Sequence, residues 1–231
     1  MSEDLVNDKP VREIGTWHIP LAFVFDVSVR QIDSLNKAIN NMIDKIKSDV
    51  RLQDIVDLGI FIFGEDDSNP VYQGFSAISE CGHITLHAND NMTFVAESLN
   101  TAVDHLKEWS SFCYSQGGRI YKPWLILVTD GEFFDSDEDL NKVSERIRKQ
   151  LNFFALGLEK CNRTQLEKLT NKNEHVIEVK VANLVEYFDY WLSRLKASTI
   201  DYDGPILYEP INLPPEVFTP FENYIYDSFI K

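Results

Sequence analysis

The chain has 231 residues, of which 44% are hydrophobic and 26% are charged, so it can bury a core and is not expected to be disordered. Its formal net charge is −15, from 37 acidic residues against 22 lysines and arginines. This charge argues against nucleic acid or an anionic membrane as the partner, because both bind through basic patches.

Residues 1–16 are acidic and polar, lack the apolar stretch of a signal peptide, and are expected to form a loose leader. No apolar run approaches the ~20 residues that a membrane-spanning helix needs. The three cysteines are scattered and lack the spacing of metal ligands. We therefore expect reduced thiols and a cytoplasmic location.

Strands and helices alternate along residues 17–196, which we take as one domain. The expected strands are Trp17–Asp26, Val56–Phe63, Tyr72–Ile78, Trp124–Thr129, Asn152–Leu158 and His175–Val181. Apolar residues at helical spacing predict helices that start near Ile32, Thr93, Leu140, Leu166 and Leu184. The glycine-containing segment Cys113–Tyr121 is expected to be a loop. This alternation predicts an α/β fold of three layers, with a doubly wound and mostly parallel sheet.

Residues 197–231 differ from the rest, because they hold five of the nine prolines together with many tyrosines, phenylalanines and isoleucines. Two readings stay open for this tail. Either it wraps back onto its own domain, or it docks on a partner, since proline-rich aromatic segments bind grooves well.

Polar side chains follow two of the most apolar strands. Asp26 ends the first strand and Ser28 follows it, while Asp130 comes directly after Trp124–Thr129. Thr93 stands in a loop before a helix. Ligands of α/β domains bind at the carboxyl ends of the strands, where these residues would meet. Their oxygen atoms suit Mg²⁺, Mn²⁺ or Ca²⁺ rather than zinc.

Together these residues resemble the von Willebrand factor A family. Its metal-ion-dependent adhesion site reads Asp-x-Ser-x-Ser after the first strand, with a Thr in a later loop and an Asp-Gly pair after a further strand. The resemblance implies a protein-binding module with Mg²⁺ or Mn²⁺, and an antiparallel edge strand at Tyr72–Ile78. The implied metal ligands are Asp26, Ser28, Thr93 and Asp130. The candidate partner contacts beside them are Arg30, Asp90 and Glu132.

Within that family the chain looks like the bacterial tellurium-resistance-associated (TerY-type) proteins. The matching pieces are Val128–Glu132 (VTDGE), Phe153–Gly157 (FFALG) and the Leu213-Pro214-Pro215 segment of the tail. This resemblance implies a role in bacterial stress response or signalling. It also implies a Ser/Thr kinase and a metal-dependent phosphatase, encoded nearby, as partners.

Two departures from the family pattern predict a degenerate metal site. Arg30 stands where the family has its second serine, and the glycines that normally flank the family threonine are absent around Thr93. Two unit charges ~4 Å apart interact by roughly 4 kcal/mol at an effective dielectric constant of 20, and a divalent ion doubles this repulsion. Arg30 either swings away from the ion or replaces it by pairing with Asp26 or Asp130.

An alternative reading is a Mg²⁺-dependent phosphoryl-transfer hydrolase of haloacid-dehalogenase type, which also places an Asp after its first strand. Its signature needs a second Asp two positions later, where this chain has Ser28. The five histidines form no ligand motif. The acids of Asp135–Asp139 either bind a cation or stabilise the positive end of a helix.

Overall fold

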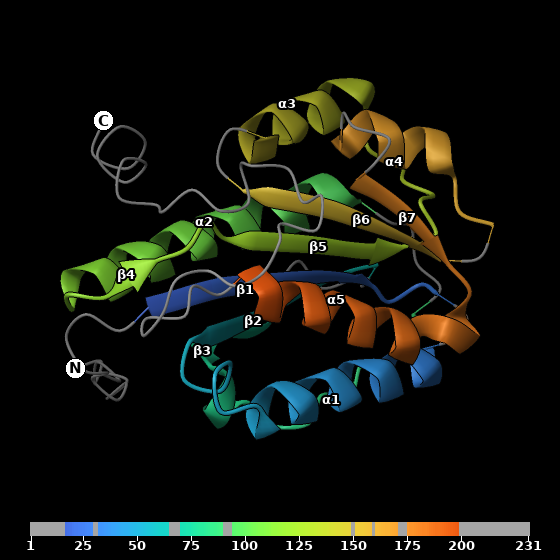
Figure 1. The fold of residues 1–231 in the computed structure, drawn as a ribbon. Helices are drawn as coiled ribbons and strands as arrows, with labels where there is room; N and C mark the ends of the chain where they lie inside the picture. Colours follow the sequence, from blue (N-terminus) through green and yellow to red (C-terminus); the bar gives the residue numbers. More distant parts are fainter. Residues whose placement is uncertain are drawn as a thin grey trace, which may run out of the picture.

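The computed structural model describes residues 17–29, 32–64, 70–89, 94–148, 151–158, 160–170 and 175–198. They form one mostly parallel sheet with the strand order β3-β2-β1-β5-β6-β7, and β4 pairs with the start of β1 (Figure 1). The strands are β1 (Trp17–Asp26), β2 (Val56–Phe63), β3 (Val71–Ala77), β4 (Arg119–Ile120), β5 (Trp124–Thr129), β6 (Asn152–Leu158) and β7 (Val176–Val179).

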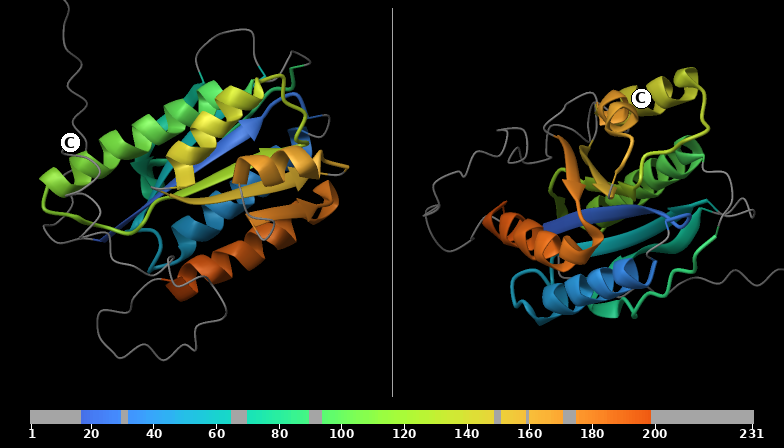
Figure 2. Two further views of the ribbon diagram at one scale, coloured as in Figure 1. Left: turned by 90° about the horizontal axis from the view of Figure 1, so that it is seen from above. Right: turned by 90° about the vertical axis from the view of Figure 1, so that its right-hand side faces the viewer.

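Helices cover both faces of the sheet, which confirms the predicted three-layer α/β fold. On one face lie α1 (Ile32–Ser48) and α5 (Leu184–Ser198), packed side by side. The other face carries α2 (Val95–Ser115), α3 (Asp137–Arg148) and α4 (Arg163–Thr170), and Figure 2 shows the same layers from two further sides. Single 3-10 turns lie at Ile78–Glu80 and Val181–Asn183. No helix within the described residues is long and apolar enough to cross a membrane.

The central strand β1 is buried on both faces because its apolar run is unbroken. Phe23 and Phe25 pack into the core beneath α1 and α5, whereas Ala22 and Val24 face the core beneath α2. Successive side chains of a strand point to opposite faces, so a strand between two helical layers needs apolar residues at every position. β1 pairs in parallel with β2 and β5, while β3 is antiparallel to β2 at the edge, as expected.

The prediction of a loop over the whole of Cys113–Tyr121 was wrong, because this segment includes the end of α2 and the strand β4. Helix α2 continues through Cys113, which is buried against the sheet, and β4 pairs with the first residues of β1. The helix ends where Gly117 takes a φ of 80° and its N–H bonds to the Tyr114 carbonyl. The glycine turn therefore ends α2 but makes up only part of the segment Cys113–Tyr121. The leader at residues 1–16 and residues 199–231 of the tail lie outside the described residues, and α5 extends to Ser198.

Residues 81–89, which we call the strap, run extended beside α1 without joining the sheet. The Asn40 side-chain amide bonds to both the N–H and the carbonyl of Ile84, and Asn36 does the same with Leu86. Two asparagines one helical turn apart thus pair with alternate residues of an extended chain. The strap ends at Asn89, whose N–H donates to the Val27 carbonyl after β1.

Candidate functional site

Asp26, the last residue of β1, is fully buried and is held by three hydrogen bonds. The Ser28 hydroxyl donates to its Oδ1 at 2.6 Å, and the Ser28 backbone N–H donates to the same atom at 3.0 Å. The Thr129 hydroxyl, from the end of β5, donates to Oδ2 at 2.7 Å. The carboxylate is therefore fixed in one orientation at the carboxyl end of the sheet.

The surroundings of Asp26 work against its charge. Burial raises the pKa of Asp26 to about 6, although the hydrogen bonds from Ser28 and Thr129 oppose the rise. The nearby negative charge of Asp130 raises this pKa further. A cation between the two carboxylates would remove this repulsion and restore the charged form.

The turn after β5 depends on Gly131. Its φ is +82°, and a Cβ there would lie 3.1 Å from the Asn162 carbonyl oxygen, so a side chain would be strained in conformation and crowded by its neighbours. The Gly131 N–H donates to the Thr129 hydroxyl oxygen at 2.9 Å. This leaves the Thr129 hydroxyl hydrogen for Asp26. The backbone carbonyl of Asp130 accepts the Asn162 N–H at 2.8 Å.

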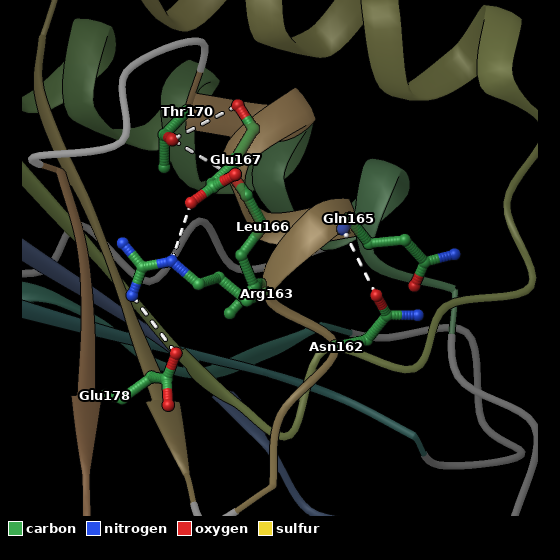
Figure 3. A network of polar contacts seen from close by, with 7 residues as sticks. All are labelled: Asn162, Arg163, Gln165, Leu166, Glu167, Thr170 and Glu178. Atoms are coloured by element: carbon green, nitrogen blue, oxygen red, sulfur yellow. Dashed lines mark hydrogen bonds and ion pairs between the residues drawn. The ribbon is translucent and has the colours of Figure 1, made fainter.

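The start of α4 supports this turn, and Figure 3 shows the polar contacts within and around that helix. The Asn162 side chain accepts the Gln165 N–H at 3.3 Å and so caps the helix. The Gln165 side chain accepts the Phe133 N–H at 3.3 Å. Arg163 pairs with Glu167 of its own helix and with Glu178 of β7. The segment after Asp130 is therefore hydrogen-bonded to a helix that is itself tied to the sheet.

Asp135 links the same loop to α2. Its two carboxylate oxygens accept the N–H groups of Val95 at 2.7 Å and Ala96 at 3.0 Å, which are the first residues of that helix. The expectation that this acidic run stabilises the start of a helix thus holds for Asp135, although its helix is α2 and not the following α3. Ser136 serves α3 instead, since its hydroxyl oxygen accepts the Asp139 N–H at 3.1 Å.

The structure brings Asp26, Ser28 and Asp130 together at one edge of the sheet, and Glu132 lies exposed beside them. Arg30, Asp90 and Thr93 lie outside the described residues. Asn89 bonds to the loop after β1, and Phe94 leads into the helix that Asp135 caps, so the chain on both sides of residues 90–93 reaches this edge.

Thr129 is the site residue that we did not predict. The available signal was a hydroxyl side chain at the end of an otherwise apolar strand, directly before the aspartate. It points back toward β1 because β1 and β5 are parallel neighbours in register, with Phe25 opposite Val128.

The donor set at this edge fits a hard divalent cation. Carboxylate and hydroxyl oxygens are the ligands that Mg²⁺ and Mn²⁺ prefer. Ser28 donates its hydroxyl hydrogen to Asp26, so the lone pairs of its oxygen stay available to a cation. The negative charge of Asp130 adds to the rise in the pKa of Asp26, and a cation bound here would offset this repulsion.

A second polar cluster lies at the opposite end of the sheet, where no spacing motif pointed to it. His18 Nδ1 and Trp109 Nε1 each lie 2.8 Å from Asp57 Oδ2, and Cys113 Sγ lies 4.0 Å from the same oxygen. Ligand atoms of His18, Asp57 and Cys113 fall within 4.8 Å of one another, all in buried side chains. Hydrogen bonds to the buried carboxylate connect β1, β2 and α2, so this cluster is a structural link.

Comparison with known proteins agrees with the fold. The family model of the von Willebrand factor type A domain matches residues 21–189, well over half of the chain. No curated protein matches the sequence. The alternative of a haloacid-dehalogenase-type hydrolase finds no support in these matches.

Several solved structures share the fold at low sequence identity. The pilus adhesin SpaC from Lactobacillus rhamnosus GG matches with a TM-score of 0.57 and 11% identity, over 82% of this chain and 31% of the adhesin. The ArnB paralog VWA2 from Sulfolobus acidocaldarius matches with a TM-score of 0.50 and 17% identity, over 74% of this chain and 44% of that one. Manganese-loaded Plasmodium vivax TRAP protein matches with a TM-score of 0.50 and 15% identity, over 73% of this chain and 71% of the TRAP chain. The chain thus spans less than half of the first two proteins.

Proposed function

The chain belongs to the von Willebrand factor type A family, and we propose that it is a non-enzymatic module that binds a protein partner through the edge formed by Asp26, Ser28 and Asp130. The observation that supports this proposal is the fixed Asp26 carboxylate. Both of its oxygens accept hydrogen bonds from groups on separate elements. A carboxylate held in this way is preorganised to bind a cation or a donor group.

We propose that Asp26, Ser28 and Asp130, together with Thr93, would hold Mg²⁺ or Mn²⁺. A bound ion would leave a coordination position for an oxygen atom of the partner. The manganese in the structurally similar TRAP protein is consistent with this choice of metal. Arg30 stands at the sequence position of the family's second serine, and its positive charge would make the site degenerate.

For the biological setting we propose the tellurium-resistance-associated (TerY-type) branch of the family and a role in bacterial stress signalling in the cytoplasm. The proposed partners are a Ser/Thr kinase and a metal-dependent phosphatase encoded nearby. Arg30, Asp90 and Glu132 would contact them. The motif VTDGE and the sequence FFALG of β6 support this branch.

The binding test uses the purified chain with a kinase or phosphatase encoded beside its gene, followed by biolayer interferometry. Asp130→Asn should weaken binding by about tenfold or more, because a central interface residue dominates affinity. Glu80→Gln is the matched control, since Glu80 is an exposed acid after β3, at the other end of the sheet. Equal affinities for the unaltered chain and Asp130→Asn would show that the partner uses another face.

A separate calorimetric titration with Mn²⁺ tests the degenerate metal site. Arg30→Ser should bind Mn²⁺ at least about tenfold more tightly than the unaltered chain, because removing one like charge recovers more than ~1.4 kcal/mol. The double variant Arg30→Ser with Asp130→Asn should lose this gain. If the unaltered chain binds Mn²⁺ as tightly as Arg30→Ser, Arg30 does not disturb the site.

A further inference from the structure

Two phenylalanines are exposed beside the proposed binding edge. Phe94 precedes the first turn of α2 and is 47% exposed, and Phe134 follows β5 by five residues and is 61% exposed. Their ring centroids lie 6.4 Å apart with an angle of 52° between the planes. They form an aromatic pair that joins the loop after Asp130 to the start of α2.

The position of Phe134 is held by its neighbours. Phe133 is buried, packs on Phe63 of β2 with the ring centroids 6.1 Å apart, and donates its N–H to Gln165. On the other side, Asp135 accepts two hydrogen bonds from α2. The exposed ring therefore sits on a tightly fixed segment, and binding through it would cost little conformational entropy.

The charge around this pair is negative. Residues 130–139 contain six acids and no lysine or arginine. Two of these acids pair with lysines, Glu138 with Lys142 of the same helix and Asp137 with Lys168 of α4, and the acidic side chains remain 76% and 82% exposed. A basic partner is favoured here over an acidic one.

The same charge argues against the C-terminal segment, and against a second copy of this chain, as the occupant. Residues 199–231 carry six acids and one lysine, so the tail would meet like charge at this edge. A second copy would bring a net charge of −15. The geometry and charge together point to a different protein.

We propose that Phe94 and Phe134 form the hydrophobic contact of the partner site, and that the partner inserts an apolar side chain flanked by lysines or arginines. This inference rests on the proposed function and specifies the chemistry of its partner. Exposed aromatic residues that become buried at the centre of an interface contribute strongly to affinity.

The experiment selects peptides from a random dodecapeptide library displayed on phage, with the full chain as bait in Mg²⁺. The selected sequences should carry an apolar residue between basic residues. A synthetic copy of the commonest peptide is then titrated against Phe94→Ala, Phe134→Ala and the control variants. Phe112 and Tyr114 are exposed to 38% and 50% at the far end of α2, so Phe112→Ala and Tyr114→Ala are matched controls.

Phe94→Ala and Phe134→Ala should each weaken peptide binding by about tenfold or more, and the controls by less than about twofold. Melting curves of all variants show whether the fold is kept. Equal loss in the controls, or selected peptides without basic residues, would overturn this inference. If Asp130→Asn abolishes binding while both phenylalanine variants keep it, the proposed function stands and the aromatic contact is refuted.

Discussion

Asp26→Asn should change how the stability of the protein depends on pH. The carboxylate is buried, and its pKa is raised from 3.8 to about 6 in the folded state, mainly by burial. An unfolded chain gives Asp26 its ordinary pKa. The folded state therefore binds more protons than the unfolded state between these two values, and its stability falls as the pH rises through this window.

The magnitude follows from the size of the shift. A change from 3.8 to about 6 corresponds to about 3 kcal/mol at ~1.4 kcal/mol per pKa unit. This stabilisation is present below pH ~4 and is lost by pH ~7. Asparagine has nearly the same shape and does not titrate. The free energy of unfolding of the unaltered chain minus that of Asp26→Asn should therefore fall by about 3 kcal/mol between pH 4 and pH 7.

Urea unfolding followed by circular dichroism measures this difference, with a chelator present so that no cation binds. The urea series is then repeated with Mn²⁺ in chains that carry Arg30→Ser. The pH dependence of the unfolding free energy should become weaker there, because a bound cation favours the ionised carboxylate. A difference in unfolding free energy that stays constant from pH 4 to pH 7 would refute the reasoning. It would mean that the folded environment leaves the Asp26 carboxyl with its ordinary pKa.

Two further substitutions test the turn after β5 and the buried hydrogen bonds of Asp57. Gly131→Ala should destabilise the protein by about 1–3 kcal/mol in urea unfolding, because its φ is +82° and a Cβ would lie 3.1 Å from the Asn162 carbonyl oxygen. An unchanged midpoint would show that this turn relaxes freely. Trp109→Phe keeps an aromatic ring near Phe75 and removes the donor to the buried Asp57 carboxylate, which should cost about 1–3 kcal/mol. A thermal shift below about 2 °C would mean that the carboxylate finds another donor.

The strands and the position of the site could be predicted from the sequence because their signals are local. The runs Val56–Phe63, Trp124–Thr129 and Asn152–Leu158 are apolar at nearly every position, and the structure has strands with these same bounds. A strand that is buried on both faces needs apolar residues at nearly every position, so its sequence pattern is recognisable. Once parallel strands are inferred, their polar ends must meet, which is why Asp26 and Asp130 could be placed at one edge.

Contacts between distant segments were decided only by the tertiary structure. Asp135 caps α2, forty residues earlier in the chain, although it lies only two residues before α3. His18 meets Asp57 and Trp109 across three elements, and Asn40 pairs with Ile84 of the strap. Short polar side chains have the same local pattern whether they face solvent or a distant partner. Their roles depend on which surfaces the packed elements bring together, and so the sequence determined the layers and the edge, while the packing determined the hydrogen bonds that hold that edge in place.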